Sequence, residues 1–175
     1  MLITIEDLQK FTGVYPEEQD SQQELFIGSA NNIVIDYLRF NPELTNYDLF
    51  VNGSGKNELY LPAKPITNLE SIKIDNVETD VSLFGFENNV LFYKNSKLVF
   101  PAGTRNIEIR FSAGYEEVPS IIKLTALRIA GILQTENAGN IGITSKSFSD
   151  SGTRTFVNTT DFSKYLLQIA DYRIF

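Results

Sequence analysis

The side chains that could do chemistry in this sequence are carboxylates, hydroxyls and amines, because the chain has no cysteine and no histidine. Thiol nucleophiles, imidazole metal ligands and every Ser-His or Cys-His catalytic arrangement are therefore excluded. Acidic clusters occur at "EEQD" (17–20) and "YEE" (115–117), where two carboxylates could act as general acid and base. Such clusters more often form solvated loops and helix starts, and we prefer that interpretation here.

A second candidate is the glycine-rich segment "VNGSGKNE" (51–58), which has some features of a phosphate-cradling loop. It lacks the P-loop spacing and the GK[ST] step into a helix, so a hairpin turn is the better interpretation. A carboxylate-dependent glycosidase would need two Asp or Glu residues in one cleft, and nothing in the sequence brings a pair together. We therefore expect no enzyme, and no catalytic, cofactor-binding or metal-binding residue.

Length and composition favour a globular chain. Its 175 residues suit one domain, or a core with one inserted subdomain. No apolar run approaches the roughly 18 residues of a membrane span, and the start "MLITIEDLQKFTG" lacks the pattern of a secretory signal. We therefore expect synthesis inside the cell and no membrane partner. The net charge of −7 argues against a surface that grips DNA phosphates, although a duplex could slide past such a surface.

Helical periodicity and capping residues predict four helices, near residues 4–12, 21–40, 118–135 and 160–172. In the second helix the expected buried stripe is Phe26, Ala30, Ile33, Val34, Tyr37 and Leu38. In the third helix it is Ile122, Ala126, Ile129, Ala130 and Leu133. These amphipathic segments predict a helical bundle core.

Between the helices the period changes to that of strands. The runs "YDLFV", "NELYL", "LESIKID", "VLFY", "KLVF" and "NIEIRFSA" predict strands, and "IDNVETD" and "ENN" are among the predicted turns. Gly114 permits the sharp turn after the last strand, and Pro119 suits the first turn of the next helix. We therefore predict an α+β fold. A small antiparallel β subdomain (about 46–113) is inserted into a helical core formed by residues 1–45 and 114–175.

The segment "QTENAGNIGITSKSFSDSGTRTFVNTT" is rich in Gly, Ser, Thr and Asn. Within it, "ITSKSFS" and "TRTFV" flank the turn "DSG" and predict a hairpin-like loop at about 143–157. Because an isolated polar hairpin is marginally stable, its partner is expected to be another chain. The terminal "YRIF" is a candidate docking segment.

The order of these parts resembles the head-tail connector, or adaptor, family of tailed bacteriophages, also described as head-completion or DNA-packaging adaptor proteins. The resemblance covers nearly the whole chain. It is carried by "MLITIEDLQKFTG", "SANNIVIDYL", "ELYLPAKPITNLESIKID", "IRFSAGYEEVPSIIKLTALRIAGIL", "SKSFSDSG" and "YLLQIADYR".

The resemblance implies a virion protein at the head-tail interface. It implies a ring of twelve copies under the portal protein, which extends the DNA tunnel and offers a docking surface to the next connector or tail protein. DNA would pass without sequence-specific binding, and no cofactor is implied. Subunit and portal contacts would fall in Ser145–Phe156 and Tyr172–Phe175, with these candidate residues: Ser145, Lys146, Phe148, Arg154, Phe156, Tyr172, Arg173, Ile174 and Phe175.

A second hypothesis stays open at this point. The inserted strands carry Phe and Tyr residues that could present aromatic rings to a ligand. The chain would then be a phage-associated carbohydrate- or host-binding β module without catalysis. A binding module is expected to be a monomer or small oligomer with affinity for a ligand, whereas an adaptor is expected to recognise a portal.

Overall fold

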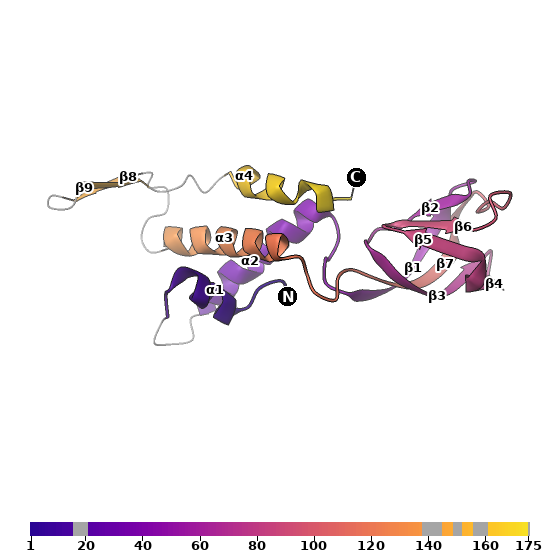
Figure 1. Ribbon diagram of the computed structural model, residues 1–175, viewed down its shortest axis with the longest axis horizontal. Coiled ribbons are helices and arrows are strands. Elements are labelled where there is room, and N and C mark those ends of the chain that lie inside the picture. Colours follow the sequence, from indigo (N-terminus) through magenta and orange to yellow (C-terminus); the bar gives the residue numbers. More distant parts are fainter. Residues whose placement is uncertain (16–20, 138–144, 149–151, 156–160, 175) are drawn as a thin grey trace. The chain divides into compact units, whose positions relative to one another are not determined.

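A computed structural model describes residues 1–15, 21–137, 145–148, 152–155 and 161–174. The chain divides into two compact units (Figure 1). One unit is helical and comprises Met1–Tyr37 and Pro119–Arg173, and the other consists mainly of Leu38–Val118 and contains the larger sheets. Each unit is described here by itself.

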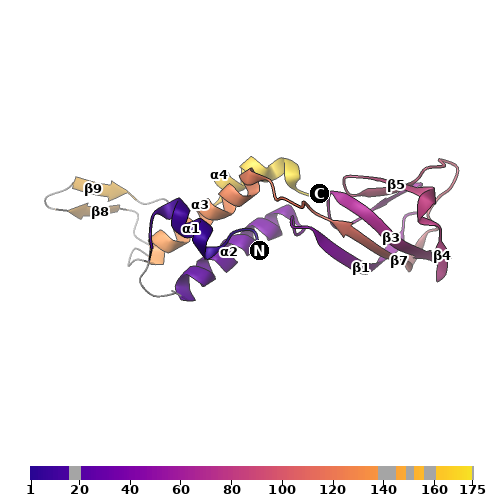
Figure 2. The same ribbon diagram turned by 60° about the horizontal axis from the view of Figure 1, so that its bottom comes forward.

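The helical unit is organised around α3. Its elements are α1 (Ile5–Thr12), α2 (Ser21–Leu38), α3 (Ser120–Asn137), α4 (Ser163–Leu166) and the 3-10 helix η2 (Leu167–Tyr172). Both α1 and the C-terminal pair α4 and η2 lie against α3 (Figures 1 and 2). Apolar residues from every one of these elements except α4 are fully buried, among them Leu8, Ile27, Ile129 and Ile169.

The predicted helical bundle core is wrong. The described elements are two 18-residue helices, an eight-residue helix, and a C-terminal segment with only four α-helical residues before it tightens into η2. These elements do not form a bundle, in which helices pack side by side at a small crossing angle around a common core. The fold is mixed α+β, and antiparallel sheets supply a large share of its buried apolar residues.

Local signals set the helix ends. Thr4 caps α1: its hydroxyl accepts a hydrogen bond from the Asp7 amide at 3.2 Å, and the Asp7 carboxylate accepts one from the Thr4 amide at 2.9 Å. This reciprocal pair is a capping box. Gly13 ends α1 in the left-handed conformation at φ 70°. The helix α2 ends at Leu38, two residues before the predicted end, because Arg39 takes a left-handed φ of 66°.

The capping box predicts a stability change for Asp7→Asn. An amide is a poorer acceptor than a carboxylate and loses the attraction to the positive helix end. We expect the variant to lower the free energy of unfolding by about 0.5–1 kcal/mol at neutral pH, measured by chemical denaturation. Glu6→Gln is the matched control, because Glu6 is in the same turn and its ion pair with Lys10 is largely exposed.

The same contact predicts a pH dependence. The amide and hydroxyl of Thr4 donate to the Asp7 carboxylate, which lowers the pKa of Asp7 below its ordinary value. A lowered pKa in the folded state adds stability above the ordinary carboxyl pKa, and this contribution is lost as the pH falls through the lowered pKa. The difference between wild type and Asp7→Asn should therefore vanish in acid. A difference that stays constant with pH would contradict this account.

The β unit contains two antiparallel sheets. The four-stranded sheet has the order β1-β7-β3-β4, from β1 (Thr45–Gly53), β7 (Gly103–Ala113), β3 (Ile66–Ile74) and β4 (Val77–Thr79) (Figure 2). The three-stranded sheet has the order β2-β6-β5, from β2 (Glu58–Tyr60), β6 (Val90–Tyr93) and β5 (Phe84–Glu87). A short 3-10 helix, η1 (Val81–Leu83), precedes β5.

The core of the β unit combines aliphatic strand residues with aromatic rings. In β7, Ile107, Ile109 and Phe111 are at most 1% exposed. A second cluster is formed by Phe84, Tyr93 and Phe100, whose ring centroids lie 4.5–5.7 Å apart. Aromatic pairs at this spacing stabilise a core beyond their buried area.

Several local predictions in this unit are wrong. The run "KLVF" (97–100) is not a strand: Leu98 and Val99 are 40% and 52% exposed, and only Phe100 of its apolar residues is buried. The predicted turn "IDNVETD" contains strand β4 after a tight turn at Asp75 and Asn76, which both have positive φ. The predicted hairpin turn "VNGSGKNE" instead connects β1 and β2, which belong to different sheets.

The joint after β7 is built on Gly114. Its φ of 113° lies in a region that residues with a side chain rarely adopt, and a Cβ there would overlap the carbonyl group of Glu43. The Gly114 amide donates to the Pro65 carbonyl at 2.9 Å, and the Tyr115 amide donates to the Pro42 carbonyl at 2.8 Å. The chain thus leaves the β unit beside the segment by which it enters. The helix α3 starts at Ser120, directly after Pro119.

Candidate functional site

The first group of predicted contact residues lies on a two-stranded hairpin. Strands β8 (Ser145–Phe148) and β9 (Gly152–Thr155) pair antiparallel. They carry four of the predicted residues: Ser145, Lys146, Phe148 and Arg154. The register places Lys146 directly opposite Arg154. Phe156 and Phe175 lie outside the described residues.

The second group stands at the end of η2. Tyr172 is its last residue, and the Arg173 guanidinium lies 5.1 Å from the ring centroid of Tyr37. The Ile174 amide donates to the Leu38 carbonyl at 3.1 Å. Tyr172, Arg173 and Ile174 are all half-buried. The described part of "YRIF" is therefore held at the C-terminal end of α2.

The segment before it is fixed to α3. The Arg128 guanidinium donates to the Gln168 side-chain carbonyl at 2.7 Å and lies 5.9 Å from the ring centroid of Tyr165. Ile169 is fully buried, whereas Leu167 is 67% exposed. One apolar anchor and one arginine thus position the residues that lead into Tyr172–Ile174.

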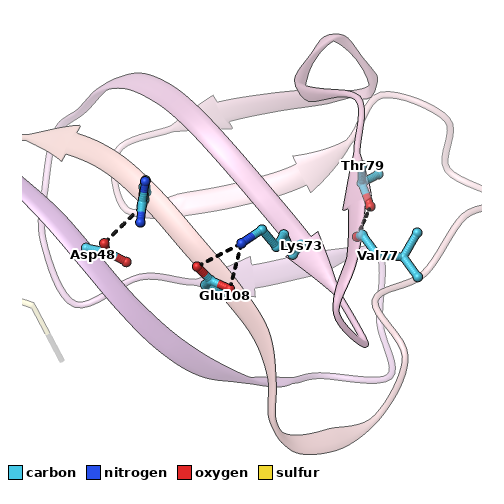
Figure 3. Close-up of polar contacts among 6 residues, drawn as sticks. Asp48, Lys73, Val77, Thr79 and Glu108 are labelled. Carbon is cyan, nitrogen blue, oxygen red and sulfur yellow. Dashed lines mark hydrogen bonds and ion pairs between the residues drawn. The ribbon is translucent and has the colours of Figure 1, made fainter.

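The outer face of the four-stranded sheet carries paired charges (Figure 3). Asp48 of β1 accepts a hydrogen bond from Arg110 of β7 at 2.9 Å. Glu108 of β7 accepts from Lys73 of β3 at 3.1 and 3.2 Å. Each of these two carboxylates faces a cation, which differs from the paired carboxylates of a glycosidase. Because the groups are 22–56% exposed, each ion pair contributes at most about 1 kcal/mol of stability.

Among the described residues, three carboxyl groups have a lowered pKa, and each stands near the start of a helix. Besides Asp7, the Ser82 hydroxyl lowers the pKa of Asp80 before η1, and the Ser163 hydroxyl lowers the pKa of Asp161 before α4. Hydrogen bonds to the charged form cause these shifts. The lowered pKa values therefore come from local hydrogen bonds at helix starts.

Within the described ranges, no group of three or more acidic residues is placed so that it could hold a metal ion. No described helix is both long and apolar enough to cross a membrane.

Sequence reasoning missed one surface, the outer edge of β1. The apolar-polar alternation of "YDLFV" shows which residues share a face of the strand. It does not show which strands lie beside it, because neighbours in a sheet come from distant parts of the chain. Only the observed order β1-β7-β3-β4 identifies β1 as an edge strand.

Comparisons with known proteins identify the class. The chain matches the sequence model of the family "Head completion protein" over residues 1–174. Its structure is similar to a chain from the neck of an empty gene transfer agent (GTA) particle, computed with C6 symmetry. That likeness has a TM-score of 0.59 and 11% sequence identity, and it covers 99% of this chain and 90% of the other. No curated protein matches the chain.

These findings define a structural protein of a phage-like particle, with a role in connecting head and tail. The chain belongs to the head completion protein family. The resemblance seen in the sequence is thereby confirmed, and so is the connector role that it implied. The location in the virion follows from the same membership.

Proposed function

We propose that copies of this chain form a ring beneath the portal vertex, extend the DNA tunnel, and present a docking surface to the next connector or tail protein. Family membership over residues 1–174 is the observation that carries the proposal. The proposed ring contains twelve copies of the chain, as the resemblance implies. In this proposal residues of about 46–113 are a β insertion carried by the flanking helical parts, and the chain is made in the host cytoplasm.

The proposed contacts are the β8–β9 hairpin, for neighbouring subunits, and the C-terminal residues from Tyr172 onward, for the portal. A two-stranded hairpin is marginally stable alone and gains from added strands. The contacts of Arg173 and Ile174 with the end of α2 would present this corner in a fixed shape. A preformed surface loses less conformational entropy on binding than a flexible tail does.

The role toward DNA is passive. With a net charge of −7, the chain lacks the cationic excess that binds phosphate backbones. Like charges would keep the duplex from adhering to the tunnel wall. We propose no catalysis, because the described outer-face carboxylates Asp48 and Glu108 are engaged by Arg110 and Lys73.

Light scattering coupled to size exclusion tests the proposal. The mass of the purified chain is measured alone and after mixing with the portal protein of the same particle. A large cyclic species, alone or only with the portal, is the expected result. A monomer that does not bind the portal protein would overturn the proposal and favour a carbohydrate- or host-binding module.

A further inference from the structure

The longest edge strand of the β unit is unprotected. β1 has nine residues and pairs with β7 on one side, and among the described strands none pairs with its other side. The other edge strands in this unit are β2, β4 and β5, with only three or four residues each. Because β4 pairs with only Ile72–Ile74 of β3, Ile66–Ser71 is a second open stretch among the described strands, and it is shorter than β1. Short edge strands prevent unwanted pairing, whereas a long one offers a row of backbone donors and acceptors.

The inward-facing side chains of β1 are only partly covered at this edge of the sheet. Tyr47, Leu49 and Val51 face inward but are only half-buried, while their β7 partners are at most 1% exposed: Phe111, Ile109 and Ile107. The segment Thr45–Gly53 contains no Lys, Arg or Pro, the residues that commonly guard an edge. A further strand beside β1 would therefore pair its backbone and cover its apolar residues.

The hairpin β8–β9 would be stabilised by pairing with a further strand. In the described part of the chain, its two strands pair only with each other. Lys146 stands opposite Arg154, and like charges at opposed positions destabilise a strand pair. The two strands carry these two basic residues and no acidic one, whereas β1 carries Asp48 and no basic residue. Asp48 is half-exposed and paired with Arg110 of β7, so the basic residues of the hairpin would share this carboxylate with Arg110.

We propose that the hairpin of one copy adds to the outer edge of β1 in the neighbouring copy. This inference rests on the proposed ring and names the surface that receives the hairpin. Strand addition supplies backbone hydrogen bonds, and charge selects the partner. Because the donor and acceptor surfaces differ, the contact is heterologous and can repeat around a closed ring.

A cation placed on β1 tests the contact. Phe50 is 49% exposed on the outer face of β1, and the Arg105 guanidinium lies 5.4 Å from its ring centroid. Phe50→Lys replaces that contact by a second positive charge, which would repel the two basic residues of an added hairpin. We expect the concentration that half-assembles the ring, measured by light scattering with the portal present, to rise by about tenfold or more. Val77→Lys is the matched control on β4, at the opposite edge of the same sheet, and should leave assembly unchanged.

Charge reversal of the hairpin completes the test. The double variant Lys146→Glu and Arg154→Glu should weaken assembly alone and restore it when combined with Phe50→Lys. Thermal unfolding checks that each variant is folded. If wild type and Phe50→Lys assemble equally, or if the combination gives no rescue, the edge contact is overturned while the ring stands. If wild type never assembles, even with the portal, both proposals fail.

Discussion

Replacing Gly114 by alanine is expected to lower the free energy of unfolding by about 3 kcal/mol or more. Two costs combine at this position. The φ of 113° is strained for any residue with a Cβ, and the added methyl group would overlap the backbone of Glu43. A backbone obstacle cannot rotate away as a side chain can. The loss should appear as a lower midpoint in chemical denaturation.

Gly28→Ala is the matched control for this prediction. A Cβ at Gly28 meets nothing within 4 Å, and the residue lies inside α2. Alanine favours a helix over glycine, so this variant should be unchanged or stabilised by up to about 1 kcal/mol. If Gly114→Ala were as stable as wild type, the joint between β7 and α3 would have a different backbone from the one described.

The second large effect is expected for Phe100→Ala. Phe100 is fully buried, and its ring lies 4.8 Å from that of Tyr93 and 5.7 Å from that of Phe84. Removing a buried phenyl ring leaves a cavity and typically costs about 3–5 kcal/mol. We expect a loss in this range, measured by denaturation. The near-ultraviolet circular dichroism of the cluster should fall as well.

Phe86→Ala serves as the control, because Phe86 lies on β5, the strand that also carries Phe84, but is 39% exposed. Its loss should be clearly smaller than that of Phe100→Ala. Equal losses would mean that Phe100 contributes no more than a partly exposed ring, and the three-ring cluster would not be the anchor of this part of the core.

The helices show how far periodicity reaches. In α3 the predicted stripe is Ile122, Ala126, Ile129, Ala130 and Leu133. The first four are fully buried, and Leu133 is half-buried. In α2 the apolar run "LFI" (25–27) left the buried face ambiguous. The prediction chose Phe26, which is half-exposed, whereas Ile27 is fully buried. Periodicity fixes a face only where polar residues mark its limits.

The absence of a bundle could not be read from the sequence in the same way. Each amphipathic segment fits a helix, but the pattern does not show how helices are aligned. The C-terminal segment was predicted as one helix over 160–172, and it forms only Ser163–Leu166 before changing to 3-10 geometry. In the 3-10 part Ile169 is fully buried and Gln168 accepts a hydrogen bond from Arg128, and these long-range contacts leave no periodic signal in the sequence.

The sheets show what the alternation of apolar and polar residues does not predict, which is the pairing of strands. Alternation located most strands, but β7 pairs with β1 and β3 through residues that lie 33 to 68 positions apart in the sequence, and such pairing leaves no local signal. The hairpin residues could be named from their turn and composition. The edge of β1 that we propose as their partner could be recognised only once the strand order was known.

We propose that this chain is a connector protein that forms a ring on the portal. Electron cryomicroscopy of the chain bound to the portal of its own particle tests it most directly. The proposed ring predicts repeated copies around the channel. The proposed edge contact predicts that the β8–β9 hairpin of each copy lies beside β1 of the next. A reconstruction with the portal bare, or with single copies attached away from the channel, would contradict the proposed ring.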